Sequence, residues 1–423
     1  MSTAEQNSSQ QTTPNPSAER RLPLRDWVLL PFLSVLTIAL LAGSTEWFAR
    51  HHFSESKTST LTCLNVSDPQ FGVSAHPNTV CSQKMRESEL VEFRFNNCGL
   101  RTNHPCTPAP EGTYRIALLG SSLAEGMWVP QPETFAALLP DKLSTMTGRK
   151  VDLYNLAMQW ETPRNAASRI DQTIAAKPDL VIWQLGPFDV DNATLKLPYI
   201  PGKQVADDGT APQAPTEATP TGFVQRIRAA AQRHGSLDGL LSAAWSRISE
   251  PLNETATVFL VKHYLYKSQS QFLRQYLANS PSSGFLHKQT PPEIQTQLGH
   301  LNGYLDEVAT RLKAANIPLM IVFLPNRPQA DMVASGSWPA TDDPYHLEDE
   351  VRQMALAHGA KFVEVLHDFQ GISNPDRLYF PVDGHLTPAG QGVIADLLAK
   401  KLTNGVIPEL RVAPSASGAQ GDK

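Results

Sequence analysis

The sequence lacks any long block of lysine and arginine, and its formal net charge is -5 at pH 7. A protein that binds nucleic acid usually presents a basic patch or stripe to the phosphate backbone. The composition therefore argues against nucleic acid as a partner. With 423 residues, the chain is long enough to bury a sizeable core in one large domain or two smaller ones.

Cysteine is also scarce. The four cysteines lie at positions 63, 81, 98 and 106, and the rest of the chain has none. No Cys-x-x-Cys pair is present, which disfavours a zinc site, and we expect neither a metal nor a cofactor. An even number of clustered cysteines favours two disulfides in an oxidising compartment. Three connectivities are open, of which we expect Cys63 with Cys81 and Cys98 with Cys106.

Charge is absent from one run near the N-terminus, Trp27–Gly43. Its seventeen residues, at a helical rise of about 1.5 Å each, reach roughly 26 Å, slightly less than a hydrocarbon core of about 30 Å. Ser44, Thr45 and Trp47 can extend it, and the two tryptophans would lie at the two membrane interfaces. The run has no polar face, which disfavours a buried helix of a soluble domain.

Arginines 20, 21 and 25 precede this run and predict a cytoplasmic N-terminus with everything after the run exported. We therefore expect a disordered cytoplasmic tail over residues 1–26 and a single-pass transmembrane anchor over 27–47. The alternative is a cleaved signal peptide, because Ala42, Gly43 and Ser44 offer small residues at a cleavage site.

Beyond the anchor, residues 48–111 show little periodicity and many turn residues, which predicts an irregular exported segment. From 112 to 403, short apolar runs alternate with amphipathic stretches, which predicts an α/β domain with a parallel sheet covered on both faces. The expected strands are 114–119, 151–156, 179–185, 317–324 and 361–366. The expected helices are 132–146, 163–176, 292–315, 344–358 and 388–402.

An insertion over residues 193–291 interrupts this alternation after the third strand. It opens with a stretch rich in Pro, Ala, Thr and Gly and continues with helical segments that carry aromatic side chains. An insertion at this point leaves the carboxyl edge of the sheet, where it could form a lid or one wall of a substrate groove. Residues 404–423 have the composition of a disordered tail.

Two motifs at opposite ends of this domain carry the chemistry. The first expected strand is followed by Gly120-Ser121-Ser122, which places a serine at the carboxyl end of a strand, where open α/β sheets bind ligands. Asp383-Gly384-His385 lies between the last strand and the last helix, at the same edge. A serine nucleophile needs a histidine base that is itself oriented by a carboxylate, and these residues supply all three groups.

With these motifs the chain resembles the SGNH/GDSL hydrolase superfamily over roughly residues 112–403. The resemblance implies a flavodoxin-like three-layer α/β/α sandwich with esterase, lipase, deacetylase or acyltransferase activity. It also implies that Ser122 is the nucleophile, with Ser121 in place of the usual aspartate. Asp383 lies two residues before His385 rather than the usual three, as in relatives of alginate O-acetylation and many membrane-tied members that act on polysaccharides.

The oxyanion-binding blocks of that superfamily are less well matched. Its second-block glycine falls at Trp160, which keeps a backbone N–H, and its third-block asparagine falls at Phe188, whose side chain has no donor. The resemblance implies donors from the backbone of Ser122 and Trp160, and Gln159 is a candidate substitute for the missing asparagine. Arg327, after the fourth strand, would face the same edge, either as a ligand for a polar or anionic substrate group or as a solvated loop residue.

These expectations favour a membrane-anchored, exported serine esterase or O-acyltransferase. The preferred substrate is an O-acetylated cell-surface polysaccharide, on grounds of topology and family resemblance. Two alternatives stay open. The departures at Phe188 and Trp160 favour a non-catalytic protein that binds or assembles surface polysaccharide, and the anchor and aromatic insertion favour a lipase-like esterase.

Overall fold

The computed structural model describes residues 24–55, 62–102, 104–194 and 255–412. It divides the chain into two units, residues 1–52 and 53–423. The described part of the first unit is one helix, α1 (Leu24–His52). Residues Trp27–His52 are long and apolar enough to cross a membrane, a test that signal sequences near the N-terminus also pass. The helix continues beyond the expected end at residue 47, and almost all of the expected tail over 1–26 lies outside the described residues.

The cysteine-containing segment is more regular than its sequence predicts. It forms two antiparallel hairpins, one from β1 (Leu64–Asp68) and β2 (Gly72–Ala75) and the other from β3 (Val80–Lys84) and β4 (Leu90–Arg94). The expectation of an irregular segment was wrong because strands of four or five residues are too short to show a clear period. The segment also buries a small cluster of its own, which includes Phe93 and Phe95.

Both disulfides have the expected sequential pairing. Cys63 pairs with Cys81, and Cys98 pairs with Cys106. The first bond links the two hairpins, because Cys63 directly precedes β1 and Cys81 lies in β3. It therefore fixes two small sheets that share few other covalent or backbone ties.

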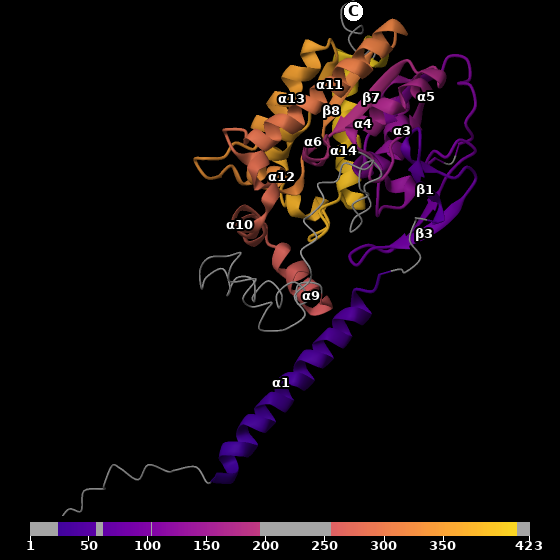
Figure 1. The fold of residues 1–423 in the computed structure, drawn as a ribbon. Helices are drawn as coiled ribbons and strands as arrows, with labels where there is room; N and C mark the ends of the chain where they lie inside the picture. The colour runs from indigo at the N-terminus through magenta and orange to yellow at the C-terminus, as the bar shows by residue number, and fades with distance from the viewer. Residues whose placement is uncertain (1–23, 56–61, 103, 195–254, 413–423) are drawn as a thin grey trace, which may run out of the picture. The chain divides into compact units, whose positions relative to one another are not determined.

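The second unit is built on a five-stranded parallel sheet in the order β6-β5-β7-β8-β9. Figure 1 labels β7 and β8 of this sheet among the surrounding helices. The strands of the sheet confirm the five expected from sequence: β5 (Tyr114–Leu119), β6 (Val151–Asn155), β7 (Leu180–Leu185), β8 (Leu319–Phe323) and β9 (Lys361–Glu364). Every residue of β5, β7 and β8 is buried, as expected of parallel strands covered on both faces. Numbered by their order in the chain, the strands lie across the sheet as 2-1-3-4-5. The chain adds one strand on one side of β5 and the remaining strands on the other side, so the topological switch point lies between β5 and β7.

Helices cover both faces of this sheet and complete the three layers. On one face, α3 (Phe135–Thr147) and α14 (Pro388–Lys401) pack against Ile116 and Leu118 of β5. On the other face, helices pack against Ala117 and Leu119 of the same strand. These helices are α4 (Pro163–Ser168), α5 (Ile170–Ala175), α11 (Pro292–Ala314) and α13 (His346–Ala357).

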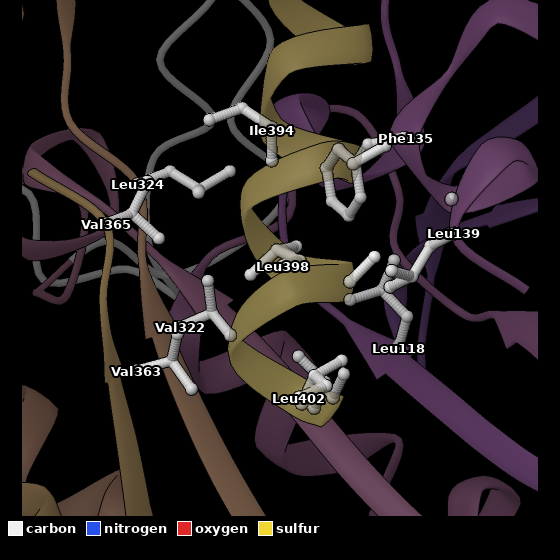
Figure 2. Packing of buried hydrophobic residues seen from close by; sticks show 14 of the residues in the cluster. Leu118, Phe135, Leu139, Val322, Leu324, Val363, Val365, Ile394, Leu398 and Leu402 are labelled. Atoms are coloured by element: carbon white, nitrogen blue, oxygen red, sulfur yellow. The ribbon is translucent and has the colours of Figure 1, made fainter. Parts of the chain in front are cut away.

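Figure 2 shows how α14 is held on the first face. Its side chain Ile394 lies between Leu324, which follows β8, and Phe135 of α3, and Leu398 lies between Phe135 and the sheet residue Val322. A further tie is polar, because the side chain of Gln391 accepts a hydrogen bond of 2.8 Å from the backbone N–H of Phe135. Helix α14, which follows the Asp383–His385 turn, is therefore anchored to helix α3, which comes after the serine turn and α2.

The structure corrects the expected elements at four places. The expected helix 163–176 is two helices, α4 and α5, that meet at Arg169, whose side chain is buried in an ion pair with Glu161 at 2.6 Å. The expected helix 132–146 begins only at Phe135, because Thr134 caps it, with a short 3₁₀ turn at Gln131–Glu133 before it. Helix α12 (Arg327–Ser335) was not expected and begins at the capping box of Asn326.

The fourth correction concerns the C-terminal tail. Residues 404–412 are not a loose tail, because a π-helical turn at Leu402–Val406 and a 3₁₀ turn at Pro408–Leu410 bring Ile407 and Leu410 into the main core. Burial of these two apolar side chains offsets the entropy of ordering the segment. Residues 413–423 lie outside the described part of the chain.

The described part of the insertion consists of α9 (Ala256–Tyr266), α10 (Gln269–Asn279) and a 3₁₀ helix at Pro281–Leu286. The Pro- and Gly-rich stretch predicted at its start lies outside the described residues. The remaining short helices of the second unit lie at the ends of the strands: α2 (Ser122–Glu125), α6 (Pro187–Asp191), η4 (Leu366–Gly371) and η5 (Pro375–Leu378).

Candidate active site

Ser122 stands at the carboxyl end of β5, beside the switch point of the sheet. The turn that carries it depends on Gly120, which has a φ of 154°. A Cβ on Gly120 would lie 2.8 Å from both the Cβ of Ala124 and the Oε1 of Gln184, so a side chain there would displace the turn. Only glycine lets the strand pass directly into α2 with Ser122 as its first residue.

Three side chains form a continuous hydrogen-bonded chain at this point. Ser122 Oγ lies 2.7 Å from His385 Nε2, and His385 Nδ1 lies 2.6 Å from Asp383 Oδ1. The backbone N–H of His385 donates to the same Asp383 oxygen at 3.1 Å. These distances match the arrangement of a nucleophile, a base and a carboxylate that orients the base.

A tight turn explains how residues only two apart can present both acid and base. Gly384 has a φ of 85°, in the left-handed region that favours glycine. The N–H of Phe380 donates to the carbonyl of His385 at 2.8 Å, and the N–H of Gly384 donates to the carbonyl of Phe380 at 3.0 Å. The turn thus folds Asp383 back onto His385, and the shorter spacing still gives a direct contact.

The pKa values of the two groups are shifted in opposite directions. Burial alone would raise the pKa of Asp383, but the charge and hydrogen bonds of His385, helped by the indole of Trp128, hold this pKa below its usual range. Burial alone would lower the pKa of His385, but Asp383 and a Coulombic contribution from Glu125 outweigh it, so this pKa is raised. The pair therefore stabilises an imidazolium, as a base that accepts the serine proton requires.

Sequence reasoning missed two residues beside this chain of hydrogen bonds. Trp128 adopts a φ of 66° and packs with Met85, Met127 and Phe380, which brings its indole to Asp383. Glu125, one helical turn after Ser122, is fully buried, and burial raises its pKa to about 7 against the opposing charge of Arg101. Glu125 could have been expected near the serine, because residues three apart in a helix lie on the same face. No local pattern in the sequence marks Trp128.

Arg101 fixes the backbone that follows the serine helix. Its buried guanidinium donates to the carbonyls of Glu125, Gly126 and Val129 at 2.9, 2.6 and 2.6 Å. It also stacks on the ring of Phe93 at 4.1 Å in β4. The cysteine-containing segment therefore contributes directly to the shape of the site.

The backbone conformation at Trp160 is the one that glycine favours, with a φ of 60°. The preceding residues are docked on the serine turn, because the N–H of Met158 donates to the carbonyl of Gly120 at 3.2 Å. Trp160 thus holds a left-handed turn although it is a bulky residue. Gln159 is fully buried, and the lining of the adjacent pocket comes from other residues.

Phe188 lies at the start of α6, directly after β7. Its side chain is 43% exposed and lines the same pocket as Ser122. A phenyl ring cannot donate a hydrogen bond to an oxyanion. Phe188 therefore gives the pocket an apolar wall beside Ser122.

A pocket of about 430 Å³ opens beside Ser122 and His385. The insertion supplies one wall, as its place in the chain predicts, with Tyr266 at the end of α9 and Phe272 and Tyr276 in α10. Amide side chains also line the pocket, at positions 275, 279 and 326. The space combines aromatic surfaces with a few polar groups, as is typical of small-molecule sites.

Arg327 lines the same pocket as Ser122 and His385, as its position after the fourth strand predicts. Its side chain is 1% exposed, so it is not a solvated loop arginine. The guanidinium donates to the carbonyls of Pro381, at 2.7 Å, and Tyr266, pairs with Asp331 at 3.3 Å and stacks over Phe272 at 3.8 Å. These intramolecular contacts join the insertion to the turn that carries Asp383 and His385.

No cluster of three or more His, Cys, Asp or Glu side chains able to hold a metal ion occurs within the described ranges. The pocket holds the hydrogen-bonded side chains of Ser122, His385 and Asp383. Their geometry is suited to acyl transfer through a covalent serine intermediate.

Comparison with known proteins agrees with this geometry. The model of the GDSL-like Lipase/Acylhydrolase family matches residues 118–393, more than half of the chain. None of the curated proteins compared with this chain matches it.

Several solved structures are similar at low sequence identity. TesA is 12% identical with a TM-score of 0.36, over 70% of this chain and 99% of TesA. A lipase/acylhydrolase from Enterococcus faecalis is 13% identical with a TM-score of 0.34, over 68% of this chain and 95% of its own. The psychrotrophic esterase EstA from Pseudoalteromonas sp. is 13% identical with a TM-score of 0.33, over 68% of this chain and 96% of its own. The extent of the family match shows that this chain belongs to the GDSL-like lipase/acylhydrolase family, within the SGNH/GDSL superfamily.

Proposed function

We propose that this protein is an exported, membrane-anchored serine esterase or O-acyltransferase. The observation that carries the proposal is the hydrogen-bonded chain from Ser122 through His385 to Asp383, at 2.7 and 2.6 Å. The apolar helix before the domain and the two disulfides support the export and anchoring.

The reaction begins when Ser122 Oγ attacks the carbonyl carbon of an ester and His385 Nε2 takes the Oγ proton. The tetrahedral intermediate collapses to an acyl-serine as His385 returns the proton to the leaving alcohol oxygen. Water or a sugar hydroxyl then attacks the acyl-serine, with the same histidine as base. Asp383 holds the imidazole in the tautomer that leaves Nε2 free to accept the proton.

For the oxyanion we propose the backbone N–H groups of Ser122 and Trp160 as donors. The left-handed conformation of Trp160 supports this assignment, because it is the conformation that glycine would adopt there. The absence of a donor at Phe188 predicts a weaker oxyanion site, since loss of one donor costs about 2.7 to 4 kcal/mol, or roughly 100- to 1,000-fold in rate. Gln159 stays a candidate only if its buried side chain turns toward the serine.

We propose an acetylated cell-surface polysaccharide as the substrate. Aromatic rings stack on the apolar faces of sugar rings, and amides bind sugar hydroxyls. The pocket offers both, with Tyr266 and Phe272 beside Gln275 and Asn279. An anchored domain outside the cytoplasm would also have surface glycans within reach.

A second candidate is a lipase-like esterase with a longer acyl group. The observation that favours it is the apolar part of the same pocket, whose lining includes Phe188, Tyr266 and Phe272. A volume of about 430 Å³ is enough for more than an acetyl group. Chain-length preference separates the two candidates.

The test uses the full-length protein in detergent and a fluorophosphonate that labels activated serines. We expect stoichiometric labelling that Ser122→Ala abolishes and the neighbouring Ser121→Ala retains. Labelling that survives Ser122→Ala would refute the assignment. Aryl esters from acetate to octanoate then distinguish an acetyl esterase from a lipase-like enzyme, and glycan binding without any labelling or turnover would instead support the non-catalytic alternative.

A further inference from the structure

Glu87 lies in the connection between β3 and β4, far from the serine and histidine motifs in sequence. Its side chain is 1% exposed. The carboxylate reaches the turn that carries Asp383 and His385: the N–H of Val382 donates to both of its oxygens, at 3.1 and 3.0 Å. The N–H of Asp383 donates to Oε2 at 3.0 Å. A side chain from the cysteine-containing segment thus holds the backbone of the acid–base turn.

The same carboxylate also holds the insertion. His263 Nδ1 of α9 lies 2.6 Å from Glu87 Oε1. The ring of His263 packs against Phe53 and Tyr264, with centroids 4.9 and 5.2 Å away. Glu87 therefore connects three segments that are distant in sequence: the β3–β4 connection, the insertion helix and the acid–base turn.

Burial of a carboxylate costs free energy unless hydrogen bonds replace its lost hydration. Here two backbone N–H groups and one imidazole nitrogen provide them. The carboxylate in turn satisfies the backbone N–H groups of Val382 and Asp383. The Glu87 carboxylate therefore makes all of its hydrogen bonds only when the hairpin, the insertion helix and the turn occupy these positions together.

We propose that Glu87 is a positioning residue that aligns Asp383 and His385 and couples them to the pocket wall built by the insertion. This inference rests on the proposed serine-hydrolase function. The backbone N–H of Asp383 is fixed by Glu87, while its side chain fixes His385 through two hydrogen bonds. Because misplacement of a catalytic group by about 1 Å can cost on the order of 100-fold in rate, this clamp acts on kcat.

The second tie gives Glu87 an effect on binding. Tyr266, which lines the pocket, lies at the end of the helix that carries His263. Loss of the His263 contact loosens that wall and leaves the hydrogen bonds from Val382 and Asp383 in place. The two ties therefore act on different kinetic constants, KM through His263 and kcat through the turn.

The matched variants are Glu87→Ala, Glu87→Gln and His263→Ala in the full-length protein, with Glu92→Ala as control. Glu92 lies in β4 of the same hairpin, and its side chain is 55% exposed. A glutamine oxygen in place of Oε2 can still accept from Val382 and Asp383, and its amide can donate to His263 in the other tautomer. Rescue by glutamine is therefore part of the prediction.

For an aryl acetate we expect Glu87→Ala to lower kcat about 10- to 100-fold and to raise KM as His263→Ala does, because it removes both ties. Glu87→Gln should stay within about fivefold in kcat, and His263→Ala should raise KM more than it lowers kcat. Glu92→Ala should match wild type. Equal kcat for Glu87→Ala and wild type, or equal losses in Glu87→Ala and Glu87→Gln, would overturn the proposal.

Amide hydrogen exchange of residues 378–388 gives a readout that does not depend on activity. We expect faster exchange in Glu87→Ala and near wild-type exchange in Glu87→Gln, with the β5 amides unchanged as evidence of an intact fold. Unchanged exchange in Glu87→Ala would contradict the clamp even if the protein were inactive. Failure of the serine labelling in the wild type, with the exchange result as expected, would refute the proposed function and leave the positioning contact standing. If Glu87→Ala does not fold, the same comparison is made with Glu87→Asp, whose shorter side chain should lower kcat and speed exchange.

Discussion

Replacement of Asp383 by asparagine tests the central chain of contacts, because it changes one oxygen to an NH₂ group and leaves the size of the side chain unchanged. In the wild type, one carboxylate oxygen accepts from both His385 Nδ1 and the His385 backbone N–H. An amide that keeps its oxygen in this place orients the ring but carries no charge. An amide that turns its NH₂ group toward Nδ1 imposes the other tautomer, in which Nε2 carries the hydrogen and cannot take the proton of Ser122.

The size of the effect follows from this geometry. Loss of the orienting carboxylate of a serine–histidine pair lowers kcat about 10⁴-fold, which corresponds to roughly 5.5 kcal/mol at 1.36 kcal/mol for each factor of ten. The pKa of His385 is raised above its ordinary value of 6.5 by Asp383 and Glu125. Activity needs the neutral imidazole, so the acidic limb of the wild-type pH profile should lie above pH 6.5. Without the charge of Asp383, the pKa of His385 falls and the limb should move to lower pH.

The assay is kcat/KM for an aryl acetate between pH 4.5 and 9, with the full-length protein in detergent. We expect a loss of three to four orders of magnitude at pH 8 in Asp383→Asn, with fluorophosphonate labelling slowed to a similar degree. The surface variant Asp396→Asn serves as a control, because its side chain is 69% exposed in a pair with Lys142. A loss below about tenfold, or an acidic limb that does not move, would refute the role assigned to Asp383.

Two further predictions concern residues beside this chain of contacts. Phe188→Asn places an amide donor at the proposed oxyanion side and should raise kcat by about tenfold or more over Phe188→Ala. One oxyanion donor is worth about 2.7 to 4 kcal/mol at most. Equal rates in the two variants would show that this position does not face the oxyanion. Glu125→Gln should change how stability depends on pH, because burial raises the pKa of Glu125 from 4.5 to about 7. The folded protein favours the neutral carboxyl of Glu125 more than the unfolded chain does. The contribution of this carboxyl to the free energy of unfolding is therefore fully present below pH 4.5 and is lost as the pH rises through about 7. Relative to wild type, the variant should therefore gain up to about 3 kcal/mol in free energy of unfolding between pH 4.5 and pH 8, measured by urea denaturation, and a difference independent of pH would contradict this account.

The parts of this fold that the sequence predicted are those with local causes. β5 matches its expected range because a short, mainly apolar run closed by a glycine is typical of a parallel strand that is buried on both faces. Ser122 and His385 were expected at one edge because the carboxyl ends of parallel strands meet there, and the structure brings them to 2.7 Å. The sequential disulfides also follow the order of the chain.

The parts that the sequence did not predict depend on contacts between distant segments. Nothing next to Glu87 in sequence indicates that its carboxylate meets Val382, 295 residues away. Arg327 lines the pocket as expected, but no local pattern encodes its contacts with Tyr266 and Phe272 of the insertion. Helix α12 was overlooked because it begins with a buried arginine followed by proline, which obscures an apolar face.

The separation of Ser122 and His385 by 263 residues also has a consequence in time. A ribosome that adds about 5 to 20 residues per second needs roughly 13 to 53 s to pass from one to the other. During that interval the growing chain contains the nucleophile without its base. Packing of α14 on α3, which follows the synthesis of His385, completes the arrangement. The growing chain thus acquires its proposed reactivity only at the end of synthesis, and a chain that stops short of residue 380 carries an inert serine.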